Sequence, residues 1–148
     1  MTITINEMTM HHYPQALALW QVSEGIGLSE ADSPAGIARF LERNPGLSFM
    51  AFDEQQLVGV VLCGHDGRRG YIHHLAVAAT HRQQGLGRTL VQHSLAALKR
   101  IGIDKCHLFV FKENQAALQF WQRLGWTERV ELRMLSSATP PLLLDQST

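Results

Sequence analysis

Cysteine is scarce in this sequence, which has only Cys63 and Cys106 among 148 residues. Both lie in apolar runs typical of strands, so we expect buried free thiols in a reducing cytoplasm and no disulfide framework. No apolar run reaches the 18 residues that indicate a membrane span. The first ten residues, MTITINEMTM, lack the basic and long apolar regions of a signal peptide. These absences predict a cytoplasmic protein that does not bind a membrane.

The chain also lacks an excess of charge, because its 13 Lys and Arg residues balance 13 Asp and Glu residues. A zero net charge gives no reason to expect nucleic acid as a partner. Acidic residues concentrate in residues 1–60 and basic residues in residues 61–148. This division fits an anionic ligand on the second half and a cationic one near the first, although chance explains it equally well.

Metal-binding motifs are missing as well. The eight histidines are scattered over different predicted elements, and neither HExxH nor CxxC occurs. Metal sites need ligands at paired spacings on one element or on facing elements. We therefore expect no metal centre.

The apolar periodicity that is present predicts an α+β fold with a mixed, largely antiparallel sheet. The nearly continuous apolar run at 105–111 is typical of a strand in the centre of a sheet. We expect one domain over residues 1–135, followed by a tail, 136–148, whose Leu142, Leu143 and Leu144 either dock on a surface or lie exposed. Strands are predicted at 3–8, 47–53, 56–64, 71–77, 105–111 and 126–135, and helices at 13–20, 34–44, 86–101 and 115–124.

The stretch HRQQGLGRTL, residues 81–90, joins a predicted strand to a predicted helix. Unpaired N–H groups and the helix dipole make such a junction suitable for a phosphate. The run from Arg82 to Gly87 matches R/Q-x-x-G-x-G/A, the pyrophosphate loop of acyl-CoA transferases. A Walker loop would need a GK[ST] sequence, and a dinucleotide fingerprint would need glycine at Leu90. A nucleotide-binding P-loop protein is therefore disfavoured, and a tight turn that binds nothing remains the alternative.

Three consecutive pieces, HHLAV, RQQGLGRTLVQHSLAAL and NQAALQFWQRLGW, together resemble the GNAT superfamily of acyl-CoA-dependent N-acyltransferases. The resemblance covers residues 53–135 and extends more loosely over the first two helices. It implies an α/β/α sandwich whose sheet is splayed between its fourth and fifth strands, and it allows for a homodimer.

The implied activity is acetyl transfer from acetyl-CoA to a primary amine of a small molecule, peptide or protein, by direct attack in a ternary complex. A GNAT-fold acyl-CoA sensor with little or no turnover is the alternative.

The resemblance also implies roles for individual residues. The N–H of Val77 would polarise the thioester oxygen. Asn114 would reach the pantetheine arm, or it would serve only as a helix N-cap. Trp121 is included among the cofactor contacts, at a position where many relatives carry a tyrosine that protonates the leaving thiolate. The implied contacts to pantetheine are the main chains of Leu75, Ala76 and Val77, and those to pyrophosphate are Arg82, Gln83, Gln84, Gly85, Leu86, Gly87 and Arg88.

The general base is predicted to be His73 or His74, since a histidine titrates close to neutral pH, and a purely structural, hydrogen-bonded role is the alternative for each of them. Adjacent strand residues point to opposite faces, so we expect only one of the two to face the cofactor slot. An indole N–H is too weak an acid to replace the tyrosine, which leaves the acid step at Trp121 open. Glu24, Glu30 and Asp32 would select a cationic acceptor, or they are simply solvated.

Overall fold

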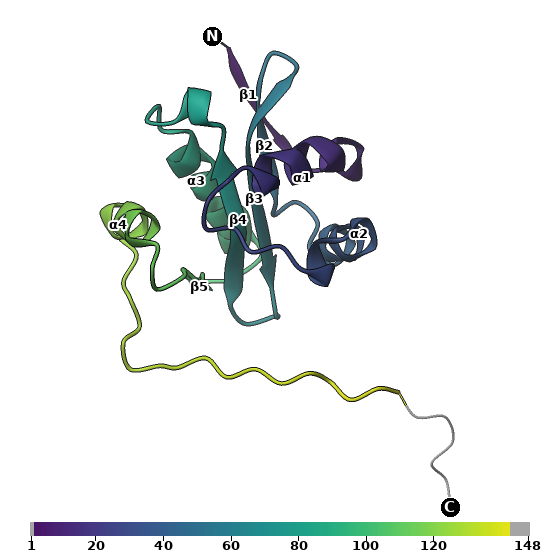
Figure 1. Cartoon of the computed structure of the whole chain (residues 1–148), viewed down its shortest axis with the longest axis vertical. Coiled ribbons are helices and arrows are strands. Elements are labelled where there is room, and N and C mark those ends of the chain that lie inside the picture. The colour runs from purple at the N-terminus through teal and green to yellow at the C-terminus, as the bar shows by residue number, and fades with distance from the viewer. Residues whose placement is uncertain (1, 143–148) are drawn as a thin grey trace, which may run out of the picture.

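A five-stranded sheet forms the centre of the computed structural model, which describes residues 2–142 (Figure 1). The strands follow the order β1-β2-β3-β4-β5. The first three junctions are antiparallel and β4 runs parallel to β5, so the predicted mixed sheet is confirmed. The strands are β1 (Ile3–Glu7), β2 (Phe49–Asp53), β3 (Gln56–His65), β4 (Gly70–Val77) and β5 (Cys106–His107).

Helices cover both faces of the sheet. Sequence signals place their ends where predicted: Ser33 accepts a hydrogen bond from the Gly36 N–H at 3.0 Å, and Pro34 occupies the first helical position. Within the part of the chain that the structure describes, α1 (Tyr13–Gln21) and α2 (Pro34–Arg43) lie on one face, and α3 (Leu86–Arg100) and α4 (Gln115–Arg123) lie on the other. Short 3-10 turns lie at η1 (Met10–His12), η2 (Glu30–Asp32) and η3 (Ala79–His81).

Two apolar cores, one on each face, hold these layers together. Trp20 and Ile37 pack against Met50 and Val60 beneath α1 and α2. On the other face, α3 and α4 bury a second set around Val58 and Val61, namely Leu90, Val91, Leu98 and Trp121. The central strand β3 therefore reads as a continuous apolar run, because both of its faces are covered.

The sheet opens between β4 and β5, as expected. The ladder contains only the pairs Gly70↔Cys106 and Tyr71↔His107, so the rest of β4 has no strand on that side among the described residues. The prediction of a central strand over residues 105–111 is wrong in both place and length. β5 has two residues and lies at the edge of the described sheet, and Phe109 and Phe111 are exposed beyond it.

The predicted closing strand at 126–135 is also wrong. After Gly125, whose φ is +97°, the chain runs away from the sheet without pairing (Figure 1). The two-residue β5 offers almost no edge to pair with, and four charged residues in the segment favour water: Glu128, Arg129, Glu131 and Arg133. Its apolar side chains, such as Val130 and Met134, are consequently exposed.

The tail from residue 136 continues in the same extended form. Leu142 is 98% exposed, whereas Leu143 and Leu144 lie outside the described residues.

Cys63 and Cys106 are free thiols, and Cys63 is fully buried. None of the helices within residues 2–142 combines the length and the apolar character needed to cross a bilayer.

Candidate functional site

The glycine loop connects β4 to α3 and ends at an unpaired helix N-terminus. Gly85 is the N-cap of α3 and has φ of +80°, which an L side chain rarely adopts. The first intrahelical bond runs from the Thr89 N–H to the Gly85 carbonyl at 3.0 Å. The N–H groups of Leu86, Gly87 and Arg88 precede that bond and remain available to an anion. No atom lies within 4 Å of a Cβ placed on Gly85, so the space in front of the loop is open.

Gly87 serves a different purpose from Gly85. A Cβ on Gly87 would lie 3.1 Å from Cζ of Phe120 and 3.7 Å from Cδ2 of Leu75. The missing side chain thus lets α4 pack closely against the start of α3. The sequence motif does not distinguish the two glycines. In the structure, only Gly87 is required by close packing.

Both loop arginines are exposed. The Arg82 Nε donates a hydrogen bond to the Val77 carbonyl at 3.0 Å, which lays the side chain across the end of β4. The loop therefore carries positive charge where β4 ends and α3 begins. Gln83 also has positive φ, +61°, and this strained conformation turns the backbone between the two elements.

A β-bulge in β4 determines where the two adjacent histidines point. Val60 pairs with Ala76 and Leu62 pairs with His73, so two residues of β4 lie opposite Val61 alone. His74, one of those two, has φ of +51°. His73 contacts the ring of Phe40 in α2, and His74 contacts the ring of Trp20 in α1. The expectation that they face opposite sides is wrong, because the bulge turns both toward the α1–α2 face.

His73 sits in a partly apolar environment. Its ring is stacked on that of Tyr71, with centroids 6.4 Å apart, and its centroid lies 6.0 Å from that of Phe40. Burial, followed by the neighbouring His74, lowers the pKa of His73 below its ordinary value of 6.5, and Asp32 opposes this only in part. The imidazole is therefore neutral near pH 7 and able to accept a proton.

His74 is held by two residues on the α1–α2 side of the sheet, Asp32 and Trp20. Its Nε2 lies 2.8 Å from Oδ1 of Asp32, and its carbonyl accepts a hydrogen bond from Trp20 Nε1 at 3.0 Å. Oδ2 of Asp32 accepts from the Ser29 N–H at 3.0 Å, and the Asp32 carbonyl accepts from the Tyr13 hydroxyl at 2.6 Å. Simple solvation of Asp32 is thus ruled out: this carboxylate joins the loop after α1 to the bulge of β4.

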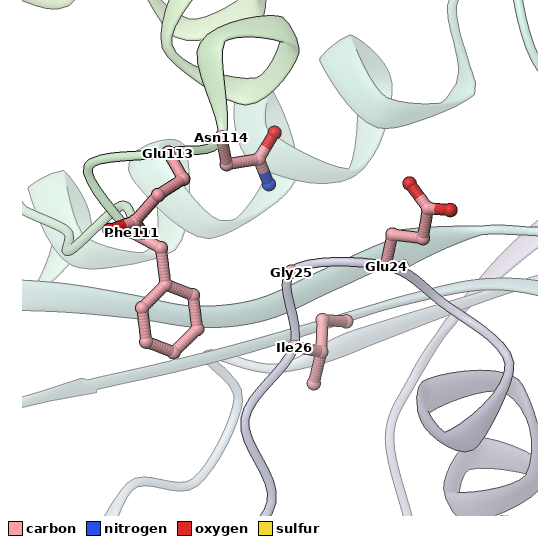
Figure 2. A pocket seen from close by; sticks show the side chains of 6 residues that line it. All are labelled: Glu24, Gly25, Ile26, Phe111, Glu113 and Asn114. Carbon is pink, nitrogen blue, oxygen red and sulfur yellow. The ribbon is translucent and has the colours of Figure 1, made fainter.

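A pocket of about 450 Å³ lies between the loop after α1 and the segment that leads into α4. Figure 2 shows Asn114 pointing its amide toward Gly25, with Phe111 on the segment that leads into α4 and Ile26 on the loop after α1. A Cβ on Gly25 would collide with Nδ2 of Asn114, so the two segments are in close contact. The pocket is lined by Glu24, Gly25, Ile26, Phe111, Glu113 and Asn114.

This pocket contains residues that sequence reasoning missed. Of the lining residues, only Glu24 and Asn114 were candidates, and no periodicity or motif marks Ile26, Phe111 or Glu113. Asn114 is confirmed as the N-cap of α4, since its Oδ1 accepts from the Ala117 N–H at 3.0 Å, which leaves its amide nitrogen facing the pocket. Glu30, by contrast, lies exposed at the start of η2 and does not line the pocket.

Trp121 belongs to the core. Its side chain is 8% exposed, and its ring packs edge-to-face against Phe120 and Trp126 with centroids 5.1 Å apart in both pairs. Within residues 2–142, no three His, Cys, Asp or Glu side chains gather as metal ligands would.

Comparison with known sequences identifies the family. Residues 13–126 match the model of the acetyltransferase (GNAT) family. The chain is 36% identical over 104 residues to N-alpha-acetyltransferase 30 of Schizosaccharomyces pombe, covering 67% of this chain and 69% of that one. It is 31% identical over 95 residues to an acetyltransferase of Pectobacterium atrosepticum, covering 64% and 67% of the two chains.

Solved structures show the same fold. A PaiA N-acetyltransferase from Thermoplasma acidophilum, in complex with coenzyme A, gives a TM-score of 0.74 at 18% identity, with 84% of this chain and 89% of that chain covered. The NatC complex bound to Gag peptide and CoA gives 0.70 at 24% identity, with 84% of each chain covered. The chain therefore shares the overall fold of these acetyltransferases.

Proposed function

Because the chain belongs to the GNAT acetyltransferase family, we propose that it acetylates the α-amine at the N-terminus of a peptide or protein. Acetyl-CoA is its co-substrate, an amine is its acceptor, and the protein is an acyltransferase. The choice of an α-amine is the finer step. It is supported by the name of the yeast relative at 36% identity, an N-alpha-acetyltransferase.

The cofactor would lie across the opening in the sheet. The backbone N–H groups from Gln83 to Arg88 would hold the pyrophosphate, with charge added by Arg82 and Arg88. The pantetheine arm would then run along the free edge of β4, beside the main chains of Leu75, Ala76 and Val77. The Val77 N–H would face the thioester oxygen, and the amide of Asn114 would meet the arm from the start of α4. The open space at Gly85 and the short β4–β5 ladder support this arrangement.

The pocket between the loop after α1 and the start of α4 would determine which acceptor binds. Glu24 and Glu113 contribute two carboxylates, and none of the six lining residues is basic. Such a pocket favours an ammonium group over an anionic ligand. Ile26 and Phe111 provide apolar surface next to these acids. A peptide N-terminus with a large apolar first side chain combines both features in one ligand.

The chemistry requires a neutral amine. The nitrogen attacks the thioester carbon, the C–S bond breaks, and the amine proton passes to the neutral His73, directly or through one water. An α-amine has a pKa of about 7.7–8.0 against about 10.4 for lysine, so roughly a tenth of it is already neutral near pH 7, far more than of a lysine side chain. The CoA thiolate leaves and takes its proton from water, since the Trp121 indole cannot supply one. His74 is bound to Asp32 and would thereby hold the loop between α1 and α2 in place.

A matched pair of peptides tests this function. The first has a free N-terminus beginning with methionine or leucine and an acetylated internal lysine, and the second has an acetylated N-terminus and a free lysine. Release of free CoA, with mass spectrometry of the product, should show acetylation of the first peptide alone. Exclusive modification of the second, or of small amines, would overturn the α-amine proposal.

A variant pair tests the pocket. Glu24→Gln together with Glu113→Gln should raise KM for the peptide about tenfold, because removing two carboxylates weakens the attraction for its ammonium group. Glu30→Gln, an exposed residue that does not line the pocket, is the control and should leave KM unchanged. Equal effects of both changes would show that only the general negative potential matters.

The free Cys63 and Cys106 support a reducing compartment such as the cytoplasm for this reaction.

A further inference from the structure

His81 stands directly before the glycine loop and is buried there, at 8% exposure. Both of its ring nitrogens are engaged. Nε2 lies 2.8 Å from Oδ2 of Asp53 at the end of β2, and Nδ1 lies 2.7 Å from Oγ1 of Thr80. A contact between residues 28 positions apart thus joins the beginning of the loop to the far end of a different strand.

The chemistry of the partners fixes the arrangement of hydrogens. An ionised carboxylate only accepts hydrogen bonds, so Nε2 must carry a hydrogen and donate it to Asp53. In the neutral imidazole, Nδ1 then accepts from the Thr80 hydroxyl. Both ring nitrogens of His81 thus have hydrogen-bond partners within the protein, and neither needs a ligand.

The position of this pair in the chain matters. His81 precedes the strained Gln83 by two residues and the N-cap Gly85 by four. Before the pair, the Ala78 N–H donates to the Val58 carbonyl at 2.8 Å, and the His81 N–H donates to the Ala78 carbonyl at 2.8 Å. After it, the backbone is next fixed by α3, beginning with the bond from Thr89 to Gly85. His81 is therefore the last buried side-chain anchor before the segment from Arg82 to Gly85.

We propose that the His81–Asp53 pair positions the glycine loop for the pyrophosphate of CoA, so that His81 and Asp53 set affinity for CoA without touching it. A backbone fixed beforehand spares the ordering free energy that a loose loop would lose on binding. The strained φ of Gln83 persists because the surrounding structure holds it in place. This inference rests on the placement of the pyrophosphate given under the proposed function.

The test compares CoA with pantetheine, which lacks the pyrophosphate and the nucleotide. Calorimetry measures Kd for CoA, and competition against CoA measures Kd for pantetheine. His81→Ala and Asp53→Asn should each weaken CoA binding about tenfold and change pantetheine binding less than twofold. His81→Gln keeps a donor near the position of Nε2 and should restore part of the loss. His93→Ala, which removes an exposed histidine on α3, is the control and should bind both ligands like the unchanged protein.

Each outcome bears on the proposal. A parallel loss for CoA and pantetheine, with a lowered melting temperature, would make the pair a general structural contact and overturn the proposal. Unchanged binding of both ligands in a folded variant would overturn it as well. If the unchanged protein binds CoA and pantetheine equally well, the pyrophosphate placement fails instead. These binding measurements need no acceptor, so failure of the α-amine proposal would be seen separately in the peptide assay.

Discussion

His73 and His74 are neighbours in β4, yet both side chains face the α1–α2 side of the sheet, because the bulge places His74 at φ of +51°. The imidazole of His73 has no hydrogen-bond partner among the described side chains, whereas that of His74 is bound to Asp32. The bulge thus gives two chemically identical side chains different surroundings, which supports the proposed roles of His73 as proton acceptor and of His74 as a tether for the loop between α1 and α2.

Replacement of these histidines should separate the two roles. His73→Ala should lower kcat/KM about 100-fold, the lower end of the usual contribution of a general base. His74→Asn should chiefly raise KM for the acceptor, because the loop that Asp32 joins to the bulge loses its anchor. Steady-state kinetics with varied peptide distinguish the two. A similar loss of kcat in both variants, or none in His73→Ala, would contradict these roles.

The lowered pKa of His73 gives a pH dependence with a definite sign. The base works when neutral, so kcat/KM should rise with pH through a pKa below 6.5, and again near 8 as an α-amine acceptor loses its proton. His73→Ala should remove the first rise and keep the second. A lysine acceptor would move the second rise toward 10.

Stability should depend on the same group. The unfolded chain binds a proton at His73 more readily than the folded one, so this contribution to stability is complete above pH 6.5 and is lost as the pH falls through the folded pKa. Denaturant unfolding of the unchanged protein and of His73→Ala, at pH 5 and pH 7.5, measures the difference. The variant should lose less stability on acidification, and an identical loss would contradict the assignment.

The two glycines of the loop should respond differently to substitution. Gly85→Val forces a side chain into positive φ and into the open space at the helix start, so CoA should bind more than tenfold more weakly. Gly87→Ala should instead lower the free energy of unfolding, by about 1 kcal/mol, through its contact with Phe120. Adding Phe120→Leu should recover that stability. Equal effects of both glycine changes on CoA affinity would contradict the distinction.

Trp121 should prove dispensable for turnover. Trp121→Phe keeps an aromatic ring between Phe120 and Trp126 but leaves a void, so stability should fall by about 1–3 kcal/mol. The rate of CoA release at saturating substrates should stay within about twofold. Trp121→Tyr offers a phenol at the same place, and a large gain in kcat would show that proton donation to the thiolate limits the reaction.

Much of the fold was predictable because its signals are local. Ser33-Pro34 starts α2, Asn114 caps α4, and the glycine loop opens α3 where the sequence indicates. The alternation and caps that carried these predictions depend on residues within a few positions of one another.

The wrong and missed predictions have a common cause: they depend on contacts between distant parts of the chain, which local sequence patterns do not predict. A strand period of two assigns His73 and His74 to opposite faces, and only pairing with β3 reveals the bulge. The run from 105 to 111 is apolar enough for a central strand, but its pairing ends after His107. Ile26 and Phe111 meet at the pocket only because the loop after α1 crosses to the start of α4.

The short ladder between β4 and β5 also bears on how the site can move. β4 is joined to β3 by six pairs along its length but to β5 by only two, at Gly70 and Tyr71. Any change in the width of the opening is therefore concentrated in the part of β4 beyond Tyr71, where, among the described residues, no backbone pairing with β5 resists it. On one side the opening is bounded by the β3–β4 ladder, and on the other side α4 is held by Phe120 against Gly87 and by Trp121 in the core. Side-chain packing, and not strand pairing, therefore sets the width of the opening on the α4 side.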